Sequence, residues 1–548
     1  MDDTNKVIKC KLKNVLDVNL DYDFLYSIIN KANNNVFICY HFIRAYILNC
    51  FNNNRQLPDI NKEFILACFK VISIKSCGPK SKNKLYNSLK NYYEKTFCTK
   101  VFGEIKYFDS KNLSYINGEF ASEMVTSYCN NIELNFYKYV SQFINQNFKD
   151  DKNIKKDKSI LWKIKKDVIY GTSESDKKYH KWIKKYKKLI LPNDLKITKT
   201  NIKKDHSKYL KCMLYMNKFL EDNKLKTFQP ICLRTDVKDK YVHFNTNAIV
   251  DIIPTIKNKN NYFKNIRNME EIIWKNLFKL NIKKLKLKNY SFNNRISTDG
   301  LSISVYFIKN NKMEDKNIKL NNIKKGRDNK RNNKNSKKNN KKDSKEDNKK
   351  DSKKDKKKNI KKDGKVDEFQ YIEDLIKLKN FNNKLKNAKK EGKLVYGDPG
   401  EKSILKLMSE TGEFYDYTTK RRIKETKRKQ YNKLIENKKN KIKINNKTIK
   451  NYEKKLTSFN KNTINEKDFL KYTKQKLSLK NKINNEKTYN EYLKKLKWFS
   501  YINTKRQEDK LLNELENKYG KSIFIIGDYG GRKGLKTIST PKIGIKDY

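Results

Sequence analysis

The chain has 548 residues and carries 128 Lys plus Arg against 61 Asp plus Glu, a formal net charge of +67. This length favours more than one domain, and this charge favours polyanionic partners whose binding weakens with salt. No apolar run reaches the roughly 18 residues of a transmembrane helix, and the polar start "MDDTNK" is unlike a secretory signal, so we expect an intracellular protein without a membrane partner.

The charge has two readings. Lys, Asn and Ile all have AT-rich codons, so genomic drift is an alternative source of the lysines. The 12% aromatic content favours nucleic acid, because aromatic side chains offer stacking surfaces to bases.

Cysteine and histidine usage limits the chemistry. All nine cysteines lie at or before Cys232, none forms a C-x-x-C pair, and there are only four histidines. This argues against a disulfide scaffold, a zinc ribbon and a Cys-His nucleophile pair. We expect buried free thiols, and any metal should be a hard cation on oxygen ligands.

Residues 1–225 are predicted to be mainly helical. Aromatic residues recur there at three- and four-residue spacing, and "VFICYHFIRAYILNCF" (36–51) is typical of a buried helix. Residues 151–225 are more basic, and Trp162 and Trp182 each lie among lysines. Each tryptophan either stacks on a base or belongs to the buried face of a helix.

Residues 226–309 turn partly to strand, and a linker follows. In "NRISTDGLSISVYFIK" (294–309), Leu301, Ile303, Val305 and Phe307 alternate onto one face. Residues 310–365 are Lys, Asn, Asp and Ser with almost no apolar content, which predicts a disordered linker. It would serve as a nuclear-import signal or a polyanion tether, or simply as a solvated spacer.

Residues 366–548 are predicted to form a second folded region. "KLVYGDPGEKSILKLMSETGEFYDYT" (393–418) predicts a strand that ends at Asp398 and then a hairpin. A very basic helix, a helical pair over 445–495 with a Thr463-x-x-Glu466 capping box, a helix closed by Gly520 and a strand "SIFIIGD" follow. The candidate phosphate-binding residues of this region are Arg421, Arg422, Lys424, Lys427, Arg428 and Arg506.

Two strands of this region end in Gly-Asp. "LVYGD" and "IFIIGD" are short apolar runs joined by helices, so in one sheet they should be parallel, with Asp398 and Asp528 at the same edge. Paired carboxylates at such an edge are suited to binding Mg²⁺ in a nuclease. Alternatively, Asp528 simply begins the Gly-rich turn "GDYGGRKG".

The series "YGDPGEKSILKLMSETGEFYDYTTKRRIKET", "LKWFSYINTKRQEDKLLNELENKYG" and "IFIIGDYGGRKGLKTISTPKIGIKDY" resembles the Fanzor proteins. These are eukaryotic and giant-virus relatives of the transposon-encoded nuclease TnpB. "ISTDGLSISVYF" is similar to the strand before their nuclease domain. The resemblance covers 294–309 and 394–548 well and the first 290 residues faintly.

The resemblance implies a multidomain α+β protein with a helical recognition lobe (1–225), a wedge-like segment (226–309), a disordered linker (310–365) and a partial RNase H-like (RuvC) domain (366–548). It implies Mg²⁺-dependent cutting of target DNA selected by a guide RNA, which reads sequence by base pairing. Asp398 matches the first catalytic carboxylate of the family. Asp528 occupies the end of the second motif, where TnpB-type proteins have glutamate and Fanzor proteins often have Gly-Asp.

The sequence departs from the family where it ends. The later glutamate, the four-cysteine zinc ribbon and the third aspartate do not follow Tyr548. We therefore expect a truncated, split or decayed copy with little or no cleavage by itself, to which a separately encoded C-terminal fragment is a conceivable partner. The alternative is a catalytically inactive RNA- or DNA-binding remnant or regulator of a mobile element. A nuclear or viral replication compartment would suit either function.

Overall fold

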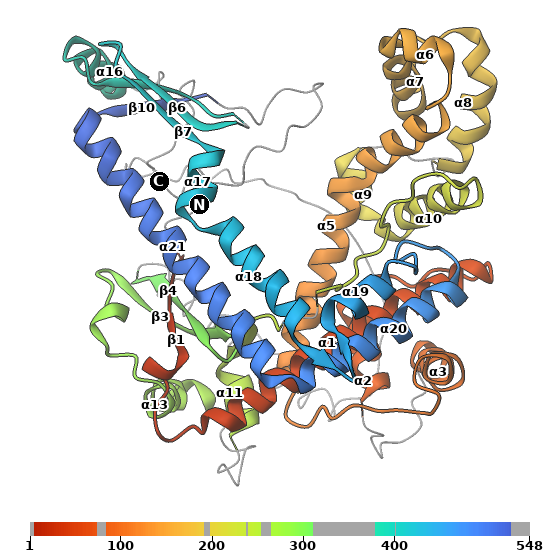
Figure 1. The fold of residues 1–548 in the computed structure, drawn as a ribbon, viewed down its shortest axis with the longest axis horizontal. Helices are drawn as coiled ribbons and strands as arrows, with labels where there is room; N and C mark the ends of the chain where they lie inside the picture. Colours follow the sequence, from red (N-terminus) through yellow and green to blue (C-terminus); the bar gives the residue numbers. More distant parts are fainter. Residues whose placement is uncertain are drawn as a thin grey trace, which may run out of the picture.

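The structure, a computed structural model, describes residues 5–73, 84–190, 198–236, 239–253, 263, 265–310, 379–400 and 402–527. Within these ranges the protein is a mixed α and β structure. Figure 1 shows a base from which two arms diverge: a helical arm on one side, and on the other two long helices that lead to a small sheet. The predicted linker, apart from Asn310, and Asp528 lie outside the described residues.

The base is organised around one long helix. The predicted buried helix at 36–51 is the inner part of α1 (Tyr22–Asn52), which begins where the Asp21 side chain accepts hydrogen bonds from two backbone N–H groups. Nearly every residue in the second half of α1 is buried, including His41 and Arg44. The cysteines described in the structure are free thiols, and most of them are buried, as the sequence predicts.

Further helices surround α1 and form the first arm. The arm is led by α5 (Ser114–Asn147), which rises from the base (Figure 1). The other helices of this part are α2 (Lys62–Ile72), α3 (Lys84–Tyr92) with a π-helical turn Tyr93–Cys98, α4 (Thr99–Val101), α6 (Lys152–Lys156), α7 (Lys158–Tyr170), α8 (Lys177–Ile190), α9 (Lys199–Lys204) and α10 (His206–Asp222). Two more helices, α11 (Thr246–Ile252) and α13 (Ile266–Leu277), lie beside the first sheet.

The first sheet is antiparallel, with the order β1-β4-β3-β2. Ile303, Val305 and Phe307 are buried, as the alternation predicts, whereas Leu301 lies just before the strand. Because β1 comes from the start of the chain, the sheet joins the first predicted segment to the second. Its strands are β1 (Asn5–Lys11), β2 (Val242–Asn245), β3 (Tyr290–Thr298) and β4 (Ser302–Lys309).

The second sheet has the order β10-β5-β6-β7 and lies at the end of the second arm (Figure 1). The predicted hairpin is confirmed, since β6 and β7 pair antiparallel around a turn at 410–413. Helix α16 (Lys379–Lys390) precedes this sheet. The strands are β5 (Leu394–Asp398), β6 (Ser403–Ser409), β7 (Phe414–Thr418) and β10 (Ile523–Ile526).

The helices between β7 and β10 differ in two details from the prediction. The basic stretch is two helices, α17 (Thr419–Glu425) and α18 (Arg428–Lys441), because Lys427 takes a left-handed φ of 56° that no α-helix contains. The predicted capping box is also wrong: Asn465 caps α20 (Glu466–Asn485). Thr463 instead accepts a bond from the Asn465 N–H.

Three hydrophobic clusters hold the described residues together. The largest contains α1 and also residues of α20, so part of the C-terminal region packs into the base. A smaller one joins the second sheet to α21 (Lys487–Tyr519), the helix that ends at Gly520 as predicted. The third lies between α20, α21 and α19 (Ile449–Leu456), beside the short hairpin of β8 (Lys443–Ile444) and β9 (Lys447–Thr448).

Candidate metal and nucleic-acid site at a sheet edge

The two Gly-Asp strands pair as the sequence predicts. β10 runs parallel to β5, with Ile523 opposite Leu394 and Ile526 opposite Gly397. The pairing continues past the strand, where the Gly527 N–H donates to the Gly397 carbonyl at 2.9 Å. The carboxyl ends of both strands therefore lie at one edge of the sheet, and Asp398 lies at that edge.

Close packing explains the glycine before Asp398. A Cβ at Gly397 would lie 2.9 Å from Leu407 Cδ2 on β6 and 3.3 Å from Ile526 Cγ1 on β10. These distances are shorter than ordinary van der Waals contact, so a larger residue would force the side chain of Leu407 or Ile526 to shift. Glycine thus allows β5 to pack closely between β6 and β10, and this packing positions the next residue, Asp398.

Asp398 is an exposed carboxylate without a described partner. It is the last residue of β5, and its side chain makes no hydrogen bond or ion pair with any residue between 5 and 527 that the structure describes. Pro399 ends the strand, and the Gly400 N–H donates to the Ser403 carbonyl at 2.8 Å to start the turn into β6. Unlike Asp398, Asp416 on β7 is already engaged, because it accepts a hydrogen bond from the Ser403 hydroxyl.

The donor chemistry fits a hard divalent cation. Mg²⁺ keeps several of its waters and is commonly held by one or two carboxylates, and Asp398 offers its oxygens at an exposed edge. In the described ranges, no three His, Cys, Asp or Glu residues group as a metal site. Asp416 lies in the same cross-strand row as Asp398, with Lys406 between them, and the second candidate from the sequence, Asp528, lies just past the last described residue.

Arg421, the first candidate phosphate-binding residue, is engaged within the protein. Its guanidinium donates to both oxygens of Glu514 on α21 at 2.6 Å and to Glu425 at 3.1 Å. It also donates to the Tyr415 hydroxyl at 3.1 Å. These bonds, with that to Glu514 contributing most, raise the pKa of Arg421. Arg421 therefore holds β7, α17 and α21 together.

The other candidates sit on the same helical pair. The side chains of Lys424, Lys427 and Arg428 are exposed and have no polar partner among the described residues. Arg422 is half-buried, and its Nε lacks a hydrogen bond within the described part of the chain.

Arg506 joins this group through the register of α21. The contacts Arg421–Glu514, Glu425–Lys510 and Tyr431–Asn503 show that α17 and α18 run antiparallel to α21. Interpolation along this ladder places Arg428 level with the exposed Arg506. Lys427, Arg428 and Arg506 are thus exposed at about the same level of this helical pair, and we call these three residues the α18–α21 basic surface.

Sequence reasoning missed Glu514 and Lys510. Arg421 and Glu514 are 93 positions apart in the sequence, and no local pattern predicts an ion pair between residues so far apart. The usable signal was the basic stretch itself, which identifies cations but not their partners.

One family model matches part of the chain. A domain described only as a domain of unknown function (DUF8286) matches residues 242–309, which run from β2 to β4 of the first sheet. The match does not include the sheet that carries Asp398. No curated protein matches the chain. In the described residues, no helix combines the length and apolar content needed to cross a membrane.

Proposed function

We propose that this chain is a Fanzor/TnpB-like, RNA-guided DNA endonuclease whose second sheet belongs to an RNase H-like (RuvC) domain. The observation that carries the proposal is the parallel pairing of β5 and β10, which leaves Asp398, without a partner among the described residues, at the sheet edge. The order of elements also agrees: a strand ending in aspartate, a hairpin, a helical insertion, and a return strand parallel to the first.

In this proposal Asp398 and Asp528 hold Mg²⁺. The metal would supply an activated water and stabilise the leaving oxygen of the cut strand. Asp398 contributes an anionic ligand fixed by the close-packed Gly397, and the exposed edge leaves room for a phosphodiester. We expect weak activity, because two-metal cleavage needs further ligands beyond Asp398 and Asp528.

The basic surfaces would hold the RNA and DNA. Lys424 and the α18–α21 basic surface lie on helices that connect the second sheet to the base, and their side chains are exposed. The net charge of +67 favours such contacts to phosphate. Guide RNA and target DNA are thus the proposed partners, with sequence read by base pairing.

The test compares two exposed aspartates of one sheet. The chain is expressed with the DNA that flanks its gene, the RNA that co-purifies is sequenced, and DNA complementary to that RNA is offered with Mg²⁺. Asp398→Ala should lower cleavage more than about 10-fold, the least expected for losing a metal ligand. Asp416→Ala, the control, should cleave like the wild type. Equal activity of Asp398→Ala and wild type would contradict the proposal.

A second candidate is a nucleic-acid-binding protein without chemistry. The exposed side chains of Lys427 and Arg428, which have no polar partner among the described residues, favour it. This candidate predicts that Asp398→Ala changes nothing, whereas Lys427→Glu with Arg428→Glu abolishes RNA binding.

A further inference from the structure

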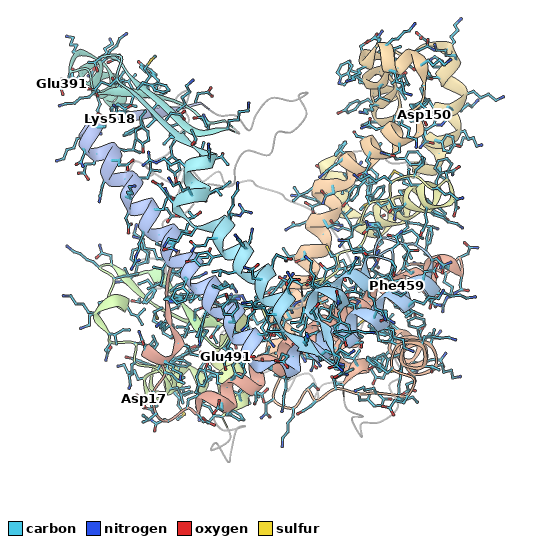
Figure 2. The ribbon with its side chains drawn as sticks, viewed as in Figure 1. Asp17, Asp150, Glu391, Phe459, Glu491 and Lys518 are labelled. Atoms are coloured by element: carbon cyan, nitrogen blue, oxygen red, sulfur yellow. The ribbon has the colours of Figure 1, made fainter. Side chains whose placement is uncertain are left out.

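The end of the helical arm is a small basic unit. Helices α6, α7 and α8 lie beyond α5, and Asp150 marks where they begin (Figures 1 and 2). The turn from α7 to α8 is fixed by the buried Asp167, which accepts bonds from the Thr172 hydroxyl at 2.7 Å and from the Glu174 and Ser175 N–H groups at 2.8 and 2.9 Å. The hydrogen bonds of Asp167 therefore fix how α7 is oriented relative to α8.

The two tryptophans of this unit have different environments. Trp182 on α8 packs against Phe148 and Tyr186, each with ring centroids 4.7 Å away. Trp162 on α7 is 50% exposed, and its described ring contact is the Lys166 ammonium, 3.8 Å from the ring centroid. The sequence allows each tryptophan either to stack on a base or to belong to the buried face of a helix. Trp182 belongs to a packed helix face, whereas Trp162 keeps a ring surface open to solvent.

Trp162 belongs to a stripe along one face of α7. Trp162, Lys166 and Tyr170 follow each other at a spacing of four residues, which places them on the same side of a helix. Tyr170 is 70% exposed. The two rings are separated by about 12 Å along the helix axis, from a rise of about 1.5 Å per residue, so each can receive a separate base.

The charge beside the stripe is positive. Lys158 and Lys163 are exposed on α7 and flank Trp162; within the described residues neither side chain makes a hydrogen bond or a close ion pair, although Lys163 lies near enough to Asp157 to lower the pKa of that carboxyl. Lys166 is engaged, since its ammonium donates to both Glu174 oxygens at 2.9 Å, so it acts mainly to hold the Trp162 ring. Open aromatic rings flanked by unpaired ammonium groups match a polyanion whose units carry flat rings.

We propose that this Trp162–Tyr170 face binds unpaired nucleotides of RNA or single-stranded DNA. The two rings stack on bases, and Lys158 and Lys163 contact phosphates. A duplex does not fit this role, because its base faces are covered by neighbouring base pairs. The inference rests on the proposed function only in taking nucleic acid as the partner.

The experiment measures affinity for a labelled 12-nucleotide oligouridine and for a blunt-ended RNA duplex of equal charge, with the full chain. Trp162→Ala should weaken oligouridine binding about 5- to 100-fold, the range expected for base–aromatic stacking. Trp162→Phe, which keeps a ring, should stay within about 3-fold of the wild type by the same reasoning. Neither change should alter binding of the duplex.

Two controls separate stacking from charge. Leu134→Ala removes another exposed apolar side chain, 78% exposed on α5, and should change nothing. Lys158→Ala with Lys163→Ala should weaken both ligands, since phosphates occur in both. Quenching of the Trp162 fluorescence by acrylamide should fall when oligouridine binds and stay unchanged with polyglutamate, an acidic polymer without rings.

The outcomes are distinguishable from those of the proposed function. Wild-type oligouridine affinity in Trp162→Ala, or equal loss of affinity for oligouridine and for the duplex, would overturn the stacking face while leaving the Asp398 site untouched. Protection of Trp162 by polyglutamate would instead indicate an acidic protein as the partner and would also overturn the proposal. If Asp398→Ala cleaved DNA like the wild type while Trp162→Ala still lost oligouridine binding, the result would count only against the nuclease.

Discussion

At the residue scale, Arg421 and Arg428 show how one basic stretch serves two purposes. Arg421 is bound by Glu514, Glu425 and Tyr415, whereas Arg428 has no described side-chain partner. A guanidinium that already has two carboxylates is poorly suited to phosphate. Arg421 should therefore contribute to stability, and Arg428 to binding.

Arg421→Met should lower the free energy of unfolding by about 1–2 kcal/mol, a discounted value for charged hydrogen bonds that are about one-third exposed. Arg428→Met should leave stability unchanged within about 0.5 kcal/mol, as is usual for surface substitutions. Urea denaturation followed at the second sheet measures both. Equal stability of the two variants would contradict the structural role of Arg421.

The ion pair between Arg421 and Glu514 predicts that the stability of the fold depends on pH. Burial raises the pKa of Glu514, but the hydrogen bonds from Arg421 and Tyr415 prevail and hold that pKa below its usual value. A carboxyl with a lowered folded-state pKa stabilises the fold above its unfolded pKa and loses that effect as pH falls through the folded value. The stability gap between wild type and Arg421→Met should therefore shrink below about pH 4.

At this scale the sequence could predict Asp398 but not the state of Arg421. A strand end followed by Pro-Gly is a local signal, so the position of Asp398 at the sheet edge follows from a few neighbouring letters. The partner of Arg421 depends on how α17 and α21 align, which is a property of the folded chain.

At the element scale, α20 is the part whose place the sequence could not predict. A helical pair was predicted there, but its apolar face does not identify its partner. In the structure Phe469 lies in the main core, with the Arg44 guanidinium carbon 4.7 Å from its ring centroid. Burial lowers the pKa of Arg44 to about 10, and none of its side-chain nitrogens bonds to a described residue. The Phe469 ring is thus a main stabilising contact for a buried cation.

Phe469→Ala should destabilise the base by about 3–5 kcal/mol, the usual range for a buried phenylalanine. Hydrogen exchange read by mass spectrometry should then speed up in α1 peptides. Leu511→Ala, which opens the smaller cluster instead, should speed up exchange in β5–β7 and leave α1 protected. Faster exchange in α1 from both variants would show that the two clusters are not independent.

At the scale of the whole molecule, the arrangement unites distant parts of the chain. β1 from the start pairs with β4, and α20 from the C-terminal region packs onto α1, while the two arms diverge from this base (Figure 1). Composition and periodicity could predict a basic α and β protein with several domains, because charge is counted directly from the sequence and periodicity is read within short windows. It could not predict which parts share a core, since that depends on pairings hundreds of residues apart.

The central claim, a divalent cation at the edge where β5 and β10 end, is tested most directly by iron-directed cleavage of the protein itself. Fe²⁺ replaces Mg²⁺, and with ascorbate and peroxide it cuts the backbone next to the bound ion. We expect cuts near residues 398 and 527 that excess Mg²⁺ suppresses, that Asp398→Asn removes and that Asp416→Asn leaves in place. Cuts that persist in Asp398→Asn, or that fall only elsewhere, would contradict it.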